Sequence, residues 1–223
     1  MILKCPGFER ELEWSENAHS HEIIIENQKY FRNFVKDFYF HDESGSGISL
    51  TKDGKSLKFK DDVDVIINPL KLDFGNRKVV TNLLKVLVET SLSENFYLST
   101  NKLKTKIVKY LNDVISSEQF GFEVEADDFS LDQIAKAVNF HVVGDEDDFV
   151  ELVTDYLEVM RELAKTKLFV FIALRSFIDN RELKRLQDNI LDRQIDILLV
   201  EDQTRERIDG VSRMTIDEDL CDF

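Results

Sequence analysis

The sequence predicts an α/β protein in which a discontinuous domain with a mostly parallel sheet is interrupted by an inserted helical domain. Near the end of the chain, the run Lys167–Leu174 is almost entirely apolar, as expected for a strand buried on both faces. A helix pattern and a second strand pattern, Ile195–Val200, follow it, so this part reads as a β-α-β unit with parallel strands. Further strand patterns lie near the beginning of the chain, whereas the middle is mainly helical. We therefore predict an α/β head made of 1–68 and 150–223, and a helical leg made of 69–149.

The first part of the head is predicted to be strand, helix, hairpin and strand. Glu22–Glu26 is a strand pattern, and aromatic residues at helical spacing follow it. Gly54-Lys55-Ser56 has the ending of a phosphate-binding P-loop, but the first glycine of that motif would fall at Ser49. Asp53-Gly54 lies between two alternating segments and instead indicates a hairpin turn. Val63–Ile67 is then the next strand.

Two helix patterns in the leg each place lysines on one side. In the first, Arg77–Glu94, Lys78 and Lys85 lie opposite the apolar face. In the second, from Lys102 to about Ser116, lysines recur at i, i+4 and i+7 and fall within about 60° of one another. That row is Lys102, Lys106 and Lys109, and Asp113 intrudes on it. Such a row can follow a phosphate backbone, but an ordinary solvated helix face has the same pattern, and the spacing alone leaves both readings open.

The second lysine-bearing helix should also have a buried side. Its N-cap is predicted at Thr100 or Asn101, because hydroxyl and amide side chains accept from the first free backbone N–H groups of a helix. Its apolar residues recur at helical spacing and are predicted to face the core. They are Leu103, Ile107, Tyr110, Leu111 and Val114.

An alternating acidic and apolar run, Gly121–Phe129, follows this helix. If the run is extended, its apolar side chains lie on one side and three carboxylates on the other, with a fourth acid next in the chain. These acids are Glu123, Glu125, Asp127 and Asp128. Like charges so close repel one another unless a cation neutralises them, and carboxylate oxygens are the ligands that Ca²⁺ prefers. A solvated acidic edge is the other reading of the run.

The helices after the acidic run have their own start signals. Ser130 and Gln133 form a capping box for a short helix, Leu131–Val138. A long helix pattern begins at Phe149, and the acids of Asp145–Asp148 precede it. Acidic residues in a first turn suit the helix dipole, so this second acidic cluster needs no metal.

Charge is distributed unevenly along the chain. The 223 residues are 43% hydrophobic, which is enough for a substantial core, and the formal net charge is −15. A net charge of this sign opposes binding to nucleic acid. From Lys71 to Lys109, however, eight Lys and Arg stand against three Asp and Glu, a balance of +5 that leaves −20 for the rest. A segment of opposite sign to its surroundings suggests a separate electrostatic task.

Cysteine use and hydropathy bear on the compartment. Cys5 and Cys221 are the only cysteines, which excludes a disulfide framework and a CxxC metal site. Two free thiols fit the cytoplasm. No apolar run approaches the roughly 20 residues that span a membrane, and the first residues lack a long apolar h-region. We therefore expect a cytoplasmic protein with no membrane contact.

Residues Tyr156–Glu201 resemble the corresponding part of the type II-A CRISPR-associated spacer-acquisition proteins, the toroidal calcium-dependent DNA-end-binding family. The similarity is carried by Glu162–Ile172, Leu183–Leu186 and Ile195–Glu201. The alternating acidic run, the hairpin and the strand after it also occur in the family's order, as does Asp73 ahead of the first lysine-bearing helix. The resemblance covers most of the chain and is one of pattern, without a signature motif.

The resemblance implies a head similar to P-loop ATPases but without a nucleotide loop, a helical leg, and a homotetrameric ring. It implies that calcium holds the ring in its DNA-binding form. Linear double-stranded DNA would pass through a basic hole, with ends preferred and no reading of sequence. The implied partners are the CRISPR adaptation integrase complex and the RNA-guided effector nuclease. No catalytic residue is implied.

The family's functional residues can be carried over by position. The candidate calcium ligands are Glu118, Glu123, Glu125, Asp127 and Asp128. The candidate DNA-binding residues are Lys78, Lys85, Lys102, Lys106 and Lys109.

Two other functions stay open on the sequence. A metal-dependent nuclease could hold magnesium at Glu123, Glu125 and Asp127, but two-metal sites need carboxylates that converge in a cleft. Here the carboxylates follow one another along a short strand, and the four histidines lie outside the acidic run. The other alternative is an acidic protein-binding adaptor whose lysines are merely solvated.

Overall fold

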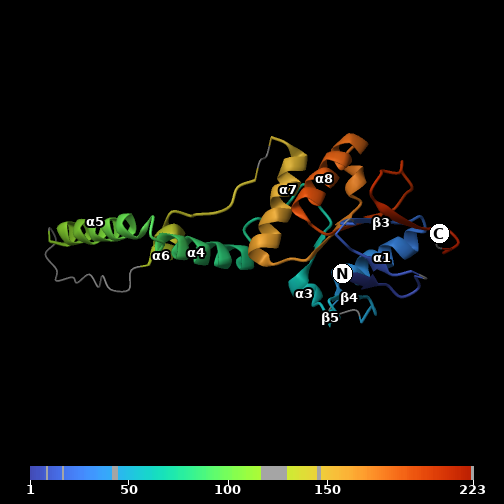
Figure 1. Ribbon diagram of the computed structural model, residues 1–223, viewed down its shortest axis with the longest axis horizontal. Coiled ribbons are helices and arrows are strands. Elements are labelled where there is room, and N and C mark those ends of the chain that lie inside the picture. Colours follow the sequence, from blue (N-terminus) through green and yellow to red (C-terminus); the bar gives the residue numbers. More distant parts are fainter. Residues whose placement is uncertain (9, 17, 42–44, 117–129, 145–146, 222–223) are drawn as a thin grey trace. The chain divides into compact units, whose positions relative to one another are not determined.

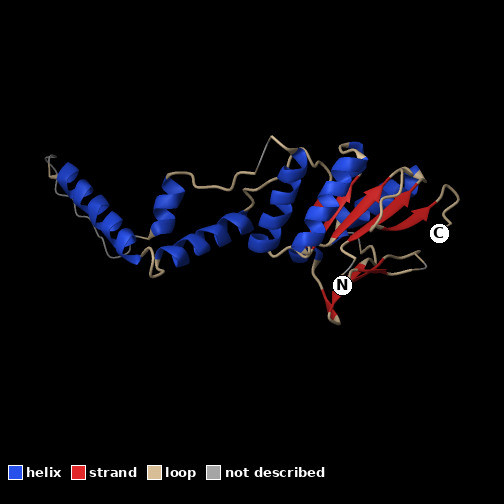
Figure 2. Cartoon of the chain, turned by 45° about the horizontal axis from the view of Figure 1, so that its top comes forward, coloured by secondary structure: helices blue, strands red, loops and turns tan. Residues whose placement is uncertain are grey.

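We analysed a computed structural model of the chain, which describes residues 1–8, 10–16, 18–41, 45–116, 130–144 and 147–221 (Figures 1 and 2). These residues form two compact units. One unit joins 1–74 to 143–223, and the other is 75–142. The α/β head with an inserted helical domain, as predicted, is confirmed as the fold class.

The first unit contains a five-stranded sheet in which every pair of neighbouring strands is parallel. Its order is β6-β7-β8-β3-β9, which places β6 and β9 at the two edges. The strands are β6 (Val63–Ile66), β7 (Leu168–Ile172), β8 (Ile197–Glu201), β3 (Ser20–Ile25) and β9 (Ser212–Ile216). The predicted β-α-β unit is therefore confirmed, with α8 (Asn180–Arg193) between β7 and β8.

A smaller antiparallel sheet has the order β2-β1-β4-β5. Its strands are β1 (Ile2–Lys4), β2 (Leu12–Glu13), β4 (Ser49–Lys52) and β5 (Lys55–Ser56). The turn between β4 and β5 is formed by Asp53 and Gly54, whose φ angles are 52° and 73°. Two successive positive φ angles are typical of a type I′ turn, so the hairpin prediction is confirmed and Gly54-Lys55-Ser56 forms no phosphate loop.

The main core lies on one face of the five-stranded sheet. Side chains alternate between the faces of a strand, so Ile23 and Ile25 of β3 point to the same side as Val200 of the neighbouring β8 and Val170 of β7. There they pack with α1 (Gln28–Tyr39), α3 (Phe59–Asp62) and the smaller sheet. The other face is covered by α8 and by α7 (Phe149–Val159), which continues as a short π-helix (Met160–Ala164).

Side chains cap the starts of both helices. Asp179 and Glu182 form a capping box at the start of α8. Asp148 caps α7, because its carboxylate accepts from the backbone N–H groups of Val150 and Glu151 at 2.9 and 3.2 Å. Its role at the helix start agrees with the prediction that this acidic cluster serves a helix; Asp145 and Glu146 lie outside the described residues.

The second unit contains α4 (Arg77–Ser91), α5 (Tyr97–Ile115) and α6 (Leu131–Ala137). Helix α6 packs against α4 and begins with the predicted capping box of Ser130 and Gln133. No described helix is long and apolar enough to cross a membrane.

Candidate nucleic-acid interface

Helix α4 carries two of the candidate DNA-binding lysines. Its start is fixed by Asn76, whose side chain accepts from the backbone N–H of Val79 at 2.9 Å. Val79 is fully buried, and this orients the helix so that Lys78 and Lys85 are exposed. The two lysines are seven residues apart, which is about two helical turns, so they share one side of the helix.

Helix α4 is shorter than the sequence pattern predicts, since it ends at Ser91 and not at Glu94. The backbone N–H of Leu92 closes the last turn on the carbonyls of Val88 and Glu89, both at 3.2 Å. The hydroxyl of Ser91 donates to the carbonyl of Val88 at 2.7 Å. Hydroxyls that bond to backbone carbonyls in this way compete with continuation of the helix.

Helix α5 carries the other three lysines, and Lys102, Lys106 and Lys109 are all exposed. The predicted N-cap at Thr100 or Asn101 is wrong, because the helix already begins at Tyr97. The carbonyl of Ser93 accepts from the backbone N–H groups of Phe96 and Tyr97 at 3.0 and 2.9 Å, and this turn starts the helix. Thr100 lies inside the helix, where its hydroxyl donates to the carbonyl of Ser91 at 3.1 Å.

The apolar side of α5 is not a core face within the described chain. None of the 19 residues of α5 is buried. Leu103, Tyr110 and Leu111 are 43%, 67% and 41% exposed, although the periodicity predicted them to face inward. Most of the stability of a helix in a protein comes from packing of its apolar face, so such a stripe normally has a partner surface.

An open groove of about 640 Å³ runs between α4 and α6. Its apolar lining comes from Val80, Leu84 and Val88 of α4. The basic residues Lys85 and Lys136 also line the groove. The ammonium of Lys136 is 2.8 Å from the carboxylate of Asp132, which lines the groove as well.

The electrostatic balance of α4 and α5 is positive. From Arg77 to Ile115 there are seven Lys and Arg and three Asp and Glu, a balance of +4. Within the described chain, no ion pair involves Lys85, Lys102, Lys106 or Lys109. These ammonium groups are therefore available to an anionic ligand such as a phosphate backbone.

The candidate calcium ligands lie outside the described residues. They are Glu118, Glu123, Glu125, Asp127 and Asp128. Among the described residues, no group of three or more His, Cys, Asp or Glu side chains could hold a metal ion.

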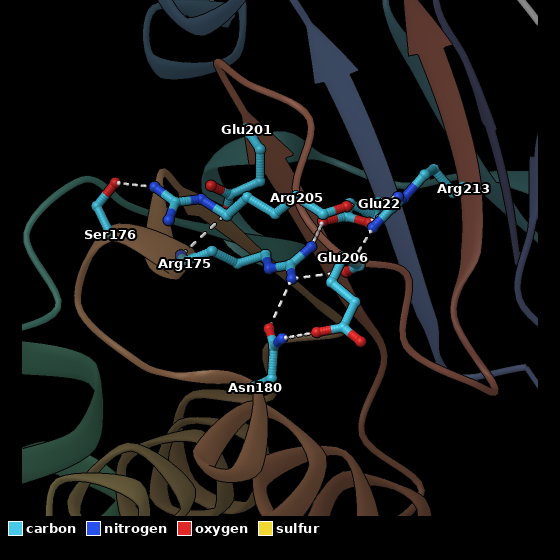
Figure 3. Close-up of polar contacts among 8 residues, drawn as sticks. All are labelled: Glu22, Arg175, Ser176, Asn180, Glu201, Arg205, Glu206 and Arg213. Carbon is cyan, nitrogen blue, oxygen red and sulfur yellow. Dashed lines mark hydrogen bonds and ion pairs between the residues drawn. The ribbon is translucent and has the colours of Figure 1, made fainter.

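A buried polar network lies toward the carboxyl ends of β3, β7 and β8, in the region where open parallel sheets usually bind ligands (Figure 3). Glu22 of β3 accepts from Arg175 at 2.8 Å and from Arg213 at 2.6 Å. The same two guanidiniums also donate to backbone carbonyls of the β8–β9 loop. Arg175 reaches the carbonyl of Glu206 at 2.8 Å, and Arg213 reaches those of Arg205 and Glu206 at 2.9 and 3.1 Å. Carbonyl groups of the β8–β9 loop therefore occupy the guanidiniums that could otherwise bind a ligand at this edge of the sheet.

Glu201, at the end of β8, is a fully buried carboxyl beside this network. One of its oxygens accepts from the backbone N–H of Arg175 at 3.1 Å, and the other has no hydrogen-bond partner among the described residues. Burial raises the pKa of Glu201 to about 7, and the nearby charge of Glu22 acts in the same direction. This network was not predicted from the sequence. Its one signal in the sequence was an acidic residue, Glu22, directly before the apolar residues Ile23–Ile25 of β3.

The turn from β3 into α1 is short and contains no glycine-rich phosphate loop. Only Glu26 and Asn27 connect the two elements. The side chain of Asn27 caps α1 by accepting from the backbone N–H of Tyr30 at 3.0 Å, and the hydroxyl of Thr204 donates to Glu26 at 2.8 Å. A phosphate cradle needs free N–H groups at such a helix start, and here the side chain of Asn27 already occupies that of Tyr30.

A protein-family model described as "CRISPR-associated protein (Cas_Csn2)" matches residues 40–220. The match includes most of the α/β unit and the whole helical unit.

Proposed function

Because the chain belongs to the CRISPR-associated Cas_Csn2 family and so has a role in CRISPR adaptation, we propose that it binds linear double-stranded DNA during spacer acquisition. The binding is independent of sequence, prefers DNA ends, and is carried out by a calcium-stabilised homotetrameric ring. The CRISPR adaptation integrase complex and the RNA-guided effector nuclease are the proposed protein partners.

The observation that carries this proposal is the lysine row of α5. Lys102, Lys106 and Lys109 lie on one side of the helix, are exposed, and form no ion pair among the described residues. In a chain with a net charge of −15, such a row gives DNA a local attractive surface while the acidic remainder repels it elsewhere. Contacts to phosphates alone give salt-sensitive binding without sequence preference.

The exposed apolar side chains of the helical unit support self-association. Eleven of the nineteen large apolar side chains that are exposed among the described residues lie between residues 75 and 142. Exposed apolar patches of this kind mark protein–protein interfaces. Assembly through this unit would bring lysine rows of several copies together, and a closed ring would add a topological restraint to the weak phosphate contacts.

Calcium enters the proposal through the acidic run and the family resemblance. Neutralising Glu123, Glu125, Asp127 and Asp128 would remove a repulsive charge that follows the lysine row in the chain. Glu118 is the further candidate ligand. The proposed role of the ion is structural, and the proposed function includes no catalysis.

A gel-shift experiment with matched DNA substrates tests the function. Linear duplex DNA and closed-circular DNA of the same sequence are compared in calcium and in chelator. We expect retardation of the linear form alone, only in calcium, with both substrates left uncut. Cleavage of the linear DNA in magnesium would instead support a nuclease. Absence of DNA binding in every ion condition would leave a protein-binding adaptor as the remaining function.

Native mass spectrometry with and without calcium tests the assembly separately. We expect a mass of four chains in calcium and smaller species in chelator. A monomer in both conditions would contradict the ring.

A further inference from the structure

A cavity of about 330 Å³ lies beside β6, the edge strand of the five-stranded sheet. Three consecutive residues of the strand line it: Val63, Asp64 and Val65. Within the described chain, β6 pairs only with β7, so its other side carries no strand. In a parallel ladder about half of the backbone groups of an edge strand point away from its single neighbour.

The lining residues show where along the strand the cavity lies. Val63 and Val65 pack with the core on the α1 side of the sheet. Asp64 points to the opposite side, where its carboxylate accepts from the hydroxyl of Tyr156 in α7 at 2.7 Å. A cavity lined by three consecutive residues whose side chains point to alternate faces lies along the edge of the sheet, beside the outward backbone of β6.

The outer wall of the cavity is aromatic. The end of α1 contributes Tyr39 and Phe40, whose rings are 4.9 Å apart and which are 55% and 44% exposed. His41 stacks on Phe59 with the ring centres 3.6 Å apart. This wall offers an apolar surface large enough for an aromatic or branched side chain.

The charge around the cavity favours an acidic ligand. Lys60 lines it, and the exposed Lys55 and Lys58 precede it in the chain; none of the three has an ion-pair partner among the described residues. Two of the neighbouring acids are engaged, since Asp62 pairs with Lys167 at 3.0 Å and Asp64 accepts from Tyr156. From Lys55 to the exposed Asp61, three lysines stand against one acid, so the local charge is positive.

We propose that this edge is a docking site for an extended acidic peptide segment of a protein partner, which adds to the sheet as a strand beside β6. The peptide backbone pairs with the outward N–H and carbonyl groups of β6. One apolar side chain enters the aromatic cavity, and acidic side chains meet Lys60 and the lysines near it. Strand addition of this kind takes its affinity from main-chain hydrogen bonds and its specificity from side-chain pockets.

A fluorescent synthetic peptide in which glutamate alternates with valine and phenylalanine tests the proposal by anisotropy. We expect saturable binding to the full chain. N-methylation of one alternate set of peptide residues should abolish binding, whereas methylation of the other set should leave it unchanged, because only every second residue faces β6. Hydrogen exchange at Val63–Ile66 should slow when the peptide binds. Equal sensitivity to both methylated sets, or no binding, would overturn the proposal.

Two surface variants locate the site and separate it from other ligands. Tyr39→Ala with Phe40→Ala should weaken peptide binding about tenfold, because both rings line the cavity. Phe177→Ala, which removes a 42% exposed ring elsewhere, is the control and should have no effect. A single-stranded oligonucleotide should not compete with the peptide. If the oligonucleotide does displace the peptide from the parent chain, and no longer does so from the Tyr39 and Phe40 variant, then the cavity binds nucleobases. That result would overturn the peptide assignment.

Discussion

Glu22 and Arg175 form an ion pair inside the head, with the guanidinium 2.8 Å from the carboxylate and side-chain exposures of only 3% and 2%. Arg213 contacts the second oxygen of Glu22 at 2.6 Å, so one buried carboxylate is shared by two guanidiniums. Both arginines also hold the β8–β9 loop through its carbonyls. The edge of the sheet where related topologies bind nucleotides is therefore used here for internal structure.

Replacement of Arg175 by methionine should destabilise the head strongly. Without Arg175, Glu22 would still contact Arg213 but would lose its other guanidinium partner. The carbonyl of Glu206 would lose one of its hydrogen-bond donors. Because Glu22 keeps one guanidinium, we expect the loss typical of a buried hydrogen bond to a charged group, about 1.5 to 3 kcal/mol of unfolding free energy. Urea unfolding of Arg175→Met measures this loss, with Arg181→Met at an exposed position as the control. Equal stability of the two variants would contradict a structural role for the network.

Glu201 should make the stability of the head depend on pH. Its pKa is raised from 4.5 to about 7 in the folded protein. Between these values the unfolded chain releases the proton and the folded chain retains it, so this group lowers stability as pH rises from about 4.5 to 7. Glu201→Gln removes the penalty and should be more stable than the parent by about 1 to 3 kcal/mol at pH 8, with little difference at pH 4.5.

Unfolding of Glu201→Gln and of the parent at several pH values checks the sign. Asp202→Asn is the matched control, because it removes an exposed carboxyl at the next position. A stability difference for Glu201→Gln that is the same at every pH would show that the carboxyl does not titrate differently in the two states.

Local patterns predicted the head well because its elements are set by short-range chemistry. The buried strand β7, the Asp53-Gly54 turn and the acidic start of α7 at Asp148 each follow from a few neighbouring residues. The Glu22 network could not be predicted in the same way. Its members come from β3, β9 and the segment after β7, so their meeting depends on strand order.

The helical unit shows a different limit of sequence reasoning. Periodicity identified the apolar side of α5, but it cannot tell whether the covering surface belongs to the same chain. Within the part of the chain that the structure describes, no residue of α5 is buried. The start of α5 was also misplaced, because the turn at Ser93 bonds to Phe96 and Tyr97 and outweighs the cap signal of Thr100. The calcium ligands lie outside the described residues, so their assignment stays a prediction.

Charge reversal in the lysine row should abolish DNA binding without disturbing assembly. Lys102→Glu with Lys106→Glu changes the charge of α5 by four units while leaving its apolar side intact. Where residual binding is measurable, the slope of log K against log salt should fall by about one for each phosphate that the variant no longer neutralises. Gel shifts over a range of salt concentrations measure this. Lys29→Glu with Lys184→Glu, both exposed in the head, is the control with the same total charge. Unchanged affinity of the Lys102 and Lys106 variant would rule out the row as the DNA-binding surface.

Polar replacement on the apolar side of α5 should prevent assembly. Leu103→Asp with Leu111→Asp places charges on a side that is exposed in the single chain, so the fold of the monomer should be preserved. Buried in an interface, the same charges would carry a large desolvation penalty. Size-exclusion chromatography with light scattering should show a monomer, and DNA binding should disappear together with assembly. An oligomer of unchanged mass would place the interface elsewhere.

Removal of two acidic charges should separate calcium binding from folding. If Glu123 and Glu125 are calcium ligands, then Glu123→Gln with Glu125→Gln should eliminate the rise in Tm that calcium produces in the parent, because a ligand stabilises a protein only by binding its folded form. In chelator the variant should unfold at the parent's temperature or slightly above it, since two like charges are removed from a crowded run. Asp217→Asn with Glu218→Gln, two acids near the end of the chain, is the charge-matched control and should retain the full calcium shift. A full shift in the Glu123 and Glu125 variant would exclude these two residues as ligands and leave the acidic run as a solvated edge.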